Sequence, residues 1–328
     1  MGQRIGTMQV FFYILGNNII PIFTVIFLGF LLNRAFKLDI FTLTKINLYV
    51  FVPIFVFVNL YTTPIDFTLI KALIFGIALL ATNMAASSWV ARIRGYDLRT
   101  TSAFKNAVMF YNSGNIGVPL ITLVFSSAPY IVDGQAPYLD LALTIQVMIL
   151  VVQNVTTNTI GVFNAGRAYL DWKESLKAIL HMPTVYAIPT ALILKSLPID
   201  LTAAPFWPGF VFIRHGLISI ALLTLGVQLS RTSFNFKDKD IYLAVAMRLI
   251  GGPALALILI KAFGFAGVVA QALMISSSVP TAVNTALIAV EFDNRPDYAS
   301  QAVMLATILS AVTLTFVIYA ARVLFPIG

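Results

Sequence analysis

The segment NSGNIGVP, residues 112–119, places polar and helix-breaking residues in the middle of an otherwise apolar stretch. Gly114 and Gly117 add backbone flexibility, and Pro119 has no amide hydrogen and clashes with the carbonyl four residues before it. Lipid offers no hydrogen-bond partners, so a backbone that leaves the helix must be buried in protein or line a cavity. The segment therefore predicts a membrane helix that opens near the bilayer centre, a feature that transporters use to bind substrates.

The composition is that of a polytopic membrane protein. Hydrophobic residues make up 59% of the 328 residues and charged residues only 10%, whereas a soluble domain carries roughly 25% charged residues. The lipid bilayer is therefore the expected environment, and the net charge of +8 does not predict a nucleic-acid partner. The chain has no cysteine and two histidines, so we expect no metal site, and no motif indicates a cofactor.

Apolar runs of about 20 residues, bounded by charges or turn residues, predict ten membrane-spanning helices. The predicted spans are 10–32, 40–60, 67–90, 104–126, 138–163, 177–197, 209–229, 240–261, 266–290 and 299–324. Fourteen of the 21 lysines and arginines fall in loops after odd-numbered spans, five fall on the other side, and two lie within spans. Because positive residues concentrate in cytoplasmic loops, we expect both termini to lie outside the cell.

The two halves of the chain, residues 1–165 and 166–328, resemble distant copies. The interrupted fourth span has a counterpart in the ninth, where the segment SSSVPTAVNT, residues 276–285, contains Pro280. Each interruption falls in the fourth span of a set of five. Because five is an odd number, the second set is inserted upside down, which predicts an inverted repeat with two broken helices that cross near the bilayer centre.

Three segments carry a resemblance to a known family. Residues 111–120 resemble the asparagine-glycine-proline motif of the auxin efflux carrier family, which includes the plant PIN-FORMED carriers and bacterial transporters of small carboxylates. The segment VPTAVN at 279–284 is similar to that family as well, as is the fifth span, with IQV at 145–147 and VQN at 152–154. The similarity covers nearly the whole chain in order. The long cytoplasmic loop of the plant members is absent between spans five and six.

The resemblance implies an all-helical fold with ten transmembrane helices, related to bile-acid symporters and sodium/proton antiporters. Scaffold helices would lie within 10–60 and 177–229, and the helices of a transport domain within 67–163 and 240–324. The resemblance also implies an elevator-type movement of the transport domain and a homodimer formed through the scaffold. A bacterial cytoplasmic (inner) membrane is the implied location.

Carboxamide side chains near the two breaks are the candidate substrate ligands. The resemblance places Asn112 and Asn115 on the first broken helix, Asn284 on the second and Gln146 on the fifth span. A broken helix also presents free amide hydrogens and the positive end of its dipole, which suit a carboxylate. Alternatively, the carboxamides join neighbouring helices through hydrogen bonds worth about 1 kcal/mol each. The residues expected to shape the breaks rather than to contact substrate are Gly114, Gly117, Pro119 and Pro280.

Charged residues within the spans are few. Arg248 lies about seven residues into the eighth span, where it could attract an anion, reach the cytoplasmic interface or cap the carbonyls of a broken helix. No acidic residue lies securely within a span, so proton coupling through a buried acid is not expected. Asp140 would become a candidate proton site if the fifth span began earlier than predicted.

These features predict a secondary carrier of a small organic anion, such as a carboxylate or an auxin-like acid, with the substrate at the crossing of spans four and nine. Potential-driven export is the simplest mechanism, because moving one charge through 100 mV supplies about 2.3 kcal/mol. Sodium- or proton-coupled symport and a non-transporting receptor are the alternatives. An enzyme is not expected, because no ATP-hydrolysis motif is present and neither histidine is placed to activate a serine near the breaks.

Overall fold

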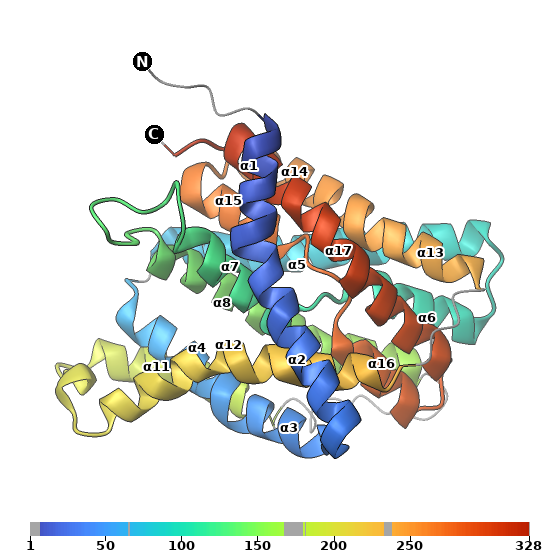
Figure 1. Cartoon of the computed structure of the whole chain (residues 1–328), viewed down its shortest axis with the longest axis horizontal. Helices are drawn as coiled ribbons and strands as arrows, with labels where there is room; N and C mark the ends of the chain where they lie inside the picture. The colour runs from blue at the N-terminus through green and yellow to red at the C-terminus, as the bar shows by residue number, and fades with distance from the viewer. Residues whose placement is uncertain (1–6, 65, 167–179, 181, 233–237, 328) are drawn as a thin grey trace.

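The computed structural model describes residues 7–64, 66–166, 180, 182–232 and 238–327. The regular structure of this part of the chain is helical, with two isolated β-bridges and no β-strand. Figure 1 shows the helices packed along and across one another. The all-helical fold that the sequence predicts is therefore confirmed.

Seven helices of the described residues are long and apolar enough to cross a membrane. They are Met8–Phe36, Ile40–Thr62, Phe67–Ile93, Leu139–Ala165, Trp207–Ser230, Lys239–Ala262 and Pro296–Leu324. Two shorter apolar helices, Ser113–Phe125 and Gly267–Ser276, lie in the two spans that were predicted to be interrupted. The total of ten spans goes beyond these seven and stays a prediction.

Several of the long helices contain one π-helical turn, labelled η. The elements of the first half are α1 Thr7–Ile14, η1 Leu15–Ile19, α2 Ile20–Phe36, α3 Ile40–Ile46, η2 Asn47–Phe51, α4 Val52–Thr62, α5 Phe67–Ile93, α6 Leu98–Met109, η3 Ser113–Gly117, α7 Val118–Phe125, α8 Leu139–Thr156, η4 Thr157–Gly161 and α9 Val162–Ala165. Those of the second half are α11 Pro183–Ser196, the 3₁₀ turn η5 Leu201–Ala203, α12 Trp207–Ser230, α13 Lys239–Ala246, η6 Met247–Gly251, α14 Gly252–Ala262, α15 Gly267–Ser276, α16 Val283–Glu291 and α17 Pro296–Leu324.

Aspartates begin several of these helices. Asp39, Asp66, Asp97 and Asp238 each precede a helix, and their carboxylates accept hydrogen bonds from backbone amides of the first turn. A cap of this kind stabilises a helix by about 1 kcal/mol. The starts of α3, α5, α6 and α13 therefore follow from the local sequence.

The helices pack in two groups. In the first group, α2 packs against α12, and α4 packs against α11 and α12. A Cβ atom at Gly226 would lie 2.0 Å from the carbonyl oxygen of Ile26, and one at Gly29 would lie 2.3 Å from that of Leu223. The backbones of α2 and α12 therefore touch, and these two glycines permit the close contact.

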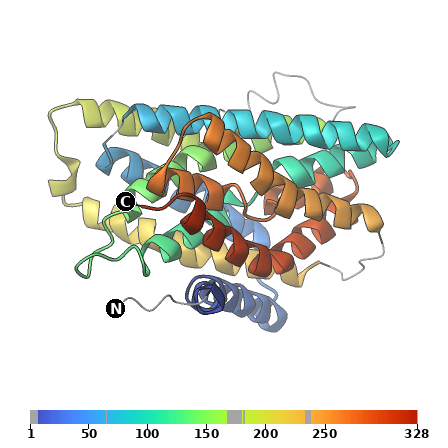
Figure 2. The same ribbon diagram turned by 90° about the horizontal axis from the view of Figure 1, so that it is seen from above.

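The second group contains α5 to α8 and α13 to α17. Within it, α5 packs against α6, α8 and α14, α15 against α8 and α17, and α13 against α6 and α17. Figure 2 shows α2 and α5 on opposite outer faces of the molecule, with the other helices between them. The two breaks lie inside this second group.

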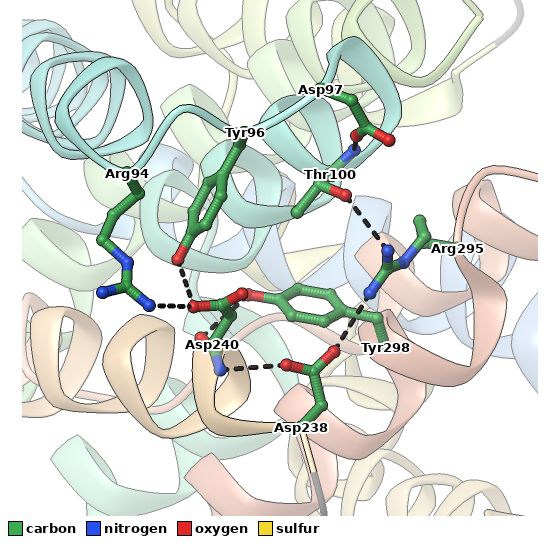
Figure 3. Close-up of polar contacts among 8 residues, drawn as sticks. All are labelled: Arg94, Tyr96, Asp97, Thr100, Asp238, Asp240, Arg295 and Tyr298. Atoms are coloured by element: carbon green, nitrogen blue, oxygen red, sulfur yellow. Dashed lines mark hydrogen bonds and ion pairs between the residues drawn. The ribbon is translucent and has the colours of Figure 1, made fainter.

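One end of the second group is held by a network of ion pairs and hydrogen bonds, drawn in Figure 3. The Asp240 carboxylate is paired with Arg94 at 3.0 Å and accepts a hydrogen bond from Tyr96 at 2.5 Å. Arg295 contacts Asp238 at 3.0 Å and donates to the Thr100 hydroxyl at 3.1 Å. Burial raises the pKa of the Tyr96 phenol, and its hydrogen bond to Asp240 raises it further. The network thus joins the ends of α5, α6, α13 and α17.

Candidate functional site

The two interrupted helices meet at their breaks. After α6 ends at Met109 and α15 ends at Ser276, the chain leaves the helix, and Tyr111 and Thr281 form an antiparallel β-bridge. The Asn112 amide donates to the Pro280 carbonyl at 2.8 Å, and the Ala282 amide donates to the Phe110 carbonyl at 3.0 Å. Each break therefore satisfies backbone groups that the other leaves free, which a buried backbone requires.

The first break lies slightly earlier in the chain than the sequence suggests. The helix is interrupted at residues 110–112, and Gly114, Gly117 and Pro119 follow in the helical turns of η3 and α7. Pro119 lies at the start of α7, directly after the π-helical turn η3. A Cβ atom at Gly117 would lie 2.4 Å from Nε2 of Gln146. The glycine thus makes room for a neighbouring helix, and the proline lies within the second half-helix instead of opening the first.

Pro280 lies within the second break. The residue before a proline avoids the helical region, so the sequence Val279-Pro280 ends the helical conformation between α15 and α16. The Pro280 carbonyl accepts the hydrogen bond from Asn112. This proline therefore shapes the break, and no observation places it in contact with a ligand.

A small cavity of about 50 Å³ adjoins the bridged breaks. Its volume holds a few water molecules or a carboxylate-sized group. The asparagines that line it from the two broken helices are Asn112, Asn115 and Asn284, and the polar residues from the first helix group are Thr44, Asn47 and Thr224. The cavity therefore lies at the boundary between the two helix groups.

Two carboxamide side chains at the cavity each have a buried donor group. Nδ2 of Asn112 and Nε2 of Gln153 are buried, have no hydrogen-bond partner among the described residues, and belong to residues that line the cavity. Their oxygens are occupied: Oδ1 of Asn112 accepts from the Asn115 amide at 3.2 Å, and Oε1 of Gln153 accepts from the Tyr111 amide at 3.0 Å. Because an unpaired buried donor costs about 1–3 kcal/mol, an acceptor on a bound ligand would relieve this cost.

Two half-helices begin at the same cavity. The turn η3, which leads into α7, starts at Ser113, and α16 starts at Val283 beside Asn284. The first amides of a helix have no partner within it, and the helix dipole makes this end positive. The cavity therefore lies at the positive ends of two helix dipoles, which suits an anion. On the first half-helix the amides of Ser113, Asn115 and Ile116 already have acceptors.

Asn47 is a cavity residue that sequence reasoning did not single out. It lies on η2, and its Nδ2 donates to Oδ1 of Asn115 at 3.1 Å across the boundary between the helix groups. The only local signal is a carboxamide within an apolar span. Gln153 lies on the same helix as Gln146, and helical spacing alone does not tell which of the two side chains faces the breaks.

Gln146 is fully buried and does not line the cavity. Its Nε2 donates to the Ser113 carbonyl at 2.6 Å, directly beside Gly117. In this structure it holds the start of the second half-helix in place. It remains a candidate ligand only if the site rearranges during transport.

The two charged candidates also lie away from the cavity lining. Arg248 is buried and stacks on the ring of Tyr111, with 4.6 Å between its guanidinium carbon and the ring centre. Asp140, in the first turn of α8, has a side chain that is 74% exposed and is paired with Arg214 at 3.0 Å. Among the described residues, no cluster of histidine, cysteine, aspartate and glutamate has the arrangement of a metal site.

Comparison with known proteins gives two findings. A model of the family described as "Membrane transport protein" matches residues 14–318 of the chain. An uncharacterized transporter of Methanothermobacter thermautotrophicus is 23% identical over 305 residues, which make up 91% of this chain and 95% of that protein.

Proposed function

The chain belongs to the membrane transport protein family, and we propose that it is a secondary carrier of small organic anions. Membership confirms the resemblance to the auxin efflux carriers and makes the chain an integral membrane transporter. The geometry of the site supports the proposed class of substrate, a small organic anion. The observation that carries it is the pair of unpaired carboxamide donors, on Asn112 and Gln153, in a cavity at the start of two half-helices.

A carboxylate matches this cavity in charge and in size. Its two oxygens would accept hydrogen bonds from Nδ2 of Asn112 and Nε2 of Gln153, and hydrogen bonds to a charged group contribute about 1.5–3 kcal/mol each. Aliphatic side chains line the rest of the cavity, among them Leu48, Leu150 and Leu287. The substrate would therefore be an acid with a small apolar body, such as a short carboxylate, and an auxin-like acid would require the cavity to widen.

The proposal includes ten spans arranged as an inverted repeat. The shorter helices α6 with α7, α15 with α16, and α11 would complete the set beside the seven long helices. Support comes from the antiparallel pairing of Tyr111 and Thr281, which relates the fourth predicted span to the ninth. The alternation of lysine and arginine between loops supports both termini outside a bacterial cytoplasmic membrane.

We propose an elevator-type movement in which the second helix group slides against the first. The cavity lies at the boundary of the groups, so a displacement would carry the bound anion from one side to the other. The close contact of α2 with α12 supports a rigid first group. The network around Asp240 and Arg295 supports movement of α5, α6, α13 and α17 as one body (Figure 3).

Reconstituted liposomes test this function. Uptake of labelled organic acids, including malonate and indole-acetate, would be measured under an imposed membrane potential, with and without sodium and proton gradients. We expect saturable uptake that follows the potential and is lost in Asn112→Ala. The matched control is Asn17→Ala, because Asn17 is exposed and donates only to the Tyr13 carbonyl of its own helix. Absence of uptake for every acid, with folded protein in the liposomes, would refute the proposed substrate class.

A further inference from the structure

Arg248 is a fully buried cation that touches both broken helices. It projects from the π-helical turn η6, and its Nη1 donates to the Val108 carbonyl at 3.1 Å. Its Nη2 donates to the Ser277 carbonyl. Val108 lies in the last turn of α6, and Ser277 caps the end of α15. One side chain thus bonds to the carboxyl-terminal ends of both first half-helices.

These two ends are the negative ends of their helices. The last carbonyls of a helix have no amide partner within it, and the helix dipole concentrates about half a negative charge there. In transporters with unwound helices, such carbonyls coordinate the sodium ion or proton that drives transport. The position that Arg248 occupies is therefore the one in which a coupling cation would be expected.

Gly252 leaves room for this guanidinium. A Cβ atom at Gly252, one turn after Arg248, would lie 2.4 Å from Nη2, so only a glycine fits there without displacing the arginine. In the described part of the chain, Arg248 has no carboxylate partner, because the four ion pairs there involve other arginines. An intramembrane charge without a counter-ion is expensive to bury and marks a functional position.

Arg248 is also connected to the anion cavity. Its guanidinium lies over the face of Tyr111, and Tyr111 lines the cavity. A single aromatic side chain therefore links the positive charge to the substrate space. The charge contributes a favourable potential for an anion in this low-dielectric region, although the arginine makes no contact there.

We propose that Arg248 is a resident cation that takes the place of a coupling ion between the two broken helices. The inference rests on the proposed function and adds how transport is driven: transport of the anion requires no sodium ion. The guanidinium neutralises the two helix ends permanently, whereas an exchangeable cation would do so only while bound. The membrane potential and the anion gradient then remain as driving forces.

Thermal melting of the purified protein tests the role of Arg248 without any transport assay. We expect Arg248→Ala to melt below the wild type, and millimolar methylguanidinium to raise its melting temperature by several degrees by refilling the site. The matched control is Arg322→Ala, because Arg322 stacks on Tyr130 at 5.1 Å but lies near the end of α17, away from the breaks. No response of Arg248→Ala to methylguanidinium, or an equal response of Arg322→Ala, would overturn the proposal.

Two further measurements cover the other outcomes. If Arg248→Ala does not fold, Arg248→Lys retains a charge at the site and should fold and remain sodium-independent. A lysine variant that is unfolded as well, or that requires sodium, contradicts a role as resident cation.

In liposomes, replacing sodium with choline should leave wild-type uptake unchanged. Wild-type uptake that requires sodium would overturn the inference while leaving the anion carrier intact. If the wild type takes up no acid, the proposed function fails, and the melting test still decides the role of Arg248.

Discussion

Asn112 is expected to have two separable roles, one in ligand binding and one in stability. Asn112 lines the cavity, and its Nδ2 has no hydrogen-bond partner among the described residues. Its Oδ1 accepts from the Asn115 amide at 3.2 Å and caps the half-helix that follows. Substitution with alanine removes both groups, and substitution with aspartate removes only the donor. The pair of variants therefore separates the two roles.

The expected magnitudes follow from these contacts. Loss of the cap in Asn112→Ala should destabilise the protein by about 1 kcal/mol. Loss of the donor should cost about 1.5–3 kcal/mol of binding to a carboxylate, which raises the dissociation constant by about tenfold to a hundredfold. Asn112→Asp keeps an acceptor for the Asn115 amide but puts a negative charge beside the anion. It should therefore retain the cap, at the cost of burying a charge, and bind even more weakly than the alanine variant.

Melting curves in detergent and equilibrium binding of the acid that the wild type transports would measure both quantities. Asn17→Ala serves as the control for loss of an asparagine in the same membrane protein. Asn112→Asp that binds the anion as tightly as the wild type would refute the donor role. Equal melting temperatures for Asn112→Ala and the wild type would refute the capping role, and the site would then need a different account.

Two further predictions concern packing around the site. Gly226→Ala would place a Cβ atom 2.0 Å from the Ile26 carbonyl oxygen. It should therefore destabilise the protein by about 1–3 kcal/mol or prevent folding. The control is Gly209→Ala on the same helix, which has open space around it and should melt like the wild type. A similar melting temperature for both variants would contradict the close contact of α2 and α12. Gln146→Leu removes one of two donors to the buried Ser113 carbonyl, which keeps its hydrogen bond from the Val118 amide. The substitution should cost about 0.5–1.5 kcal/mol of stability, whereas the folded fraction should bind the anion with little change in affinity. A large loss of affinity at unchanged stability would identify Gln146 as a ligand.

Local sequence features predicted much of the architecture. The apolar runs predicted an all-helical membrane protein, and seven long apolar helices are present in the described residues. Proline and glycine in otherwise apolar segments predicted two interrupted helices, since lipid forces a span to be helical unless a residue prevents it. The segments around Asn112 and Pro280 are both outside the helical conformation, and their backbones pair with each other.

Roles that depend on the direction of a side chain could not be read from the sequence. Gln146 and Gln153 lie on the same helix, but only Gln153 lines the cavity, because the face that meets the breaks is set by packing. Asn47 joins the site from a helix about seventy residues earlier than Asn115, through a contact between the two helix groups. For Arg248 the sequence left three roles open, and the structure shows it at the ends of the two broken helices.

The sequence by itself determined the class of protein and which two spans are interrupted, because both follow from local properties: the hydrophobicity that a bilayer demands and the backbone limits of proline and glycine. The first break itself lies at residues 110–112, before its glycines and proline. The tertiary structure alone decided which polar groups face the cavity and which ones hold the helices together. That choice depends on which helix faces meet, and burial then leaves some donors paired and others, such as Nδ2 of Asn112, available for a ligand.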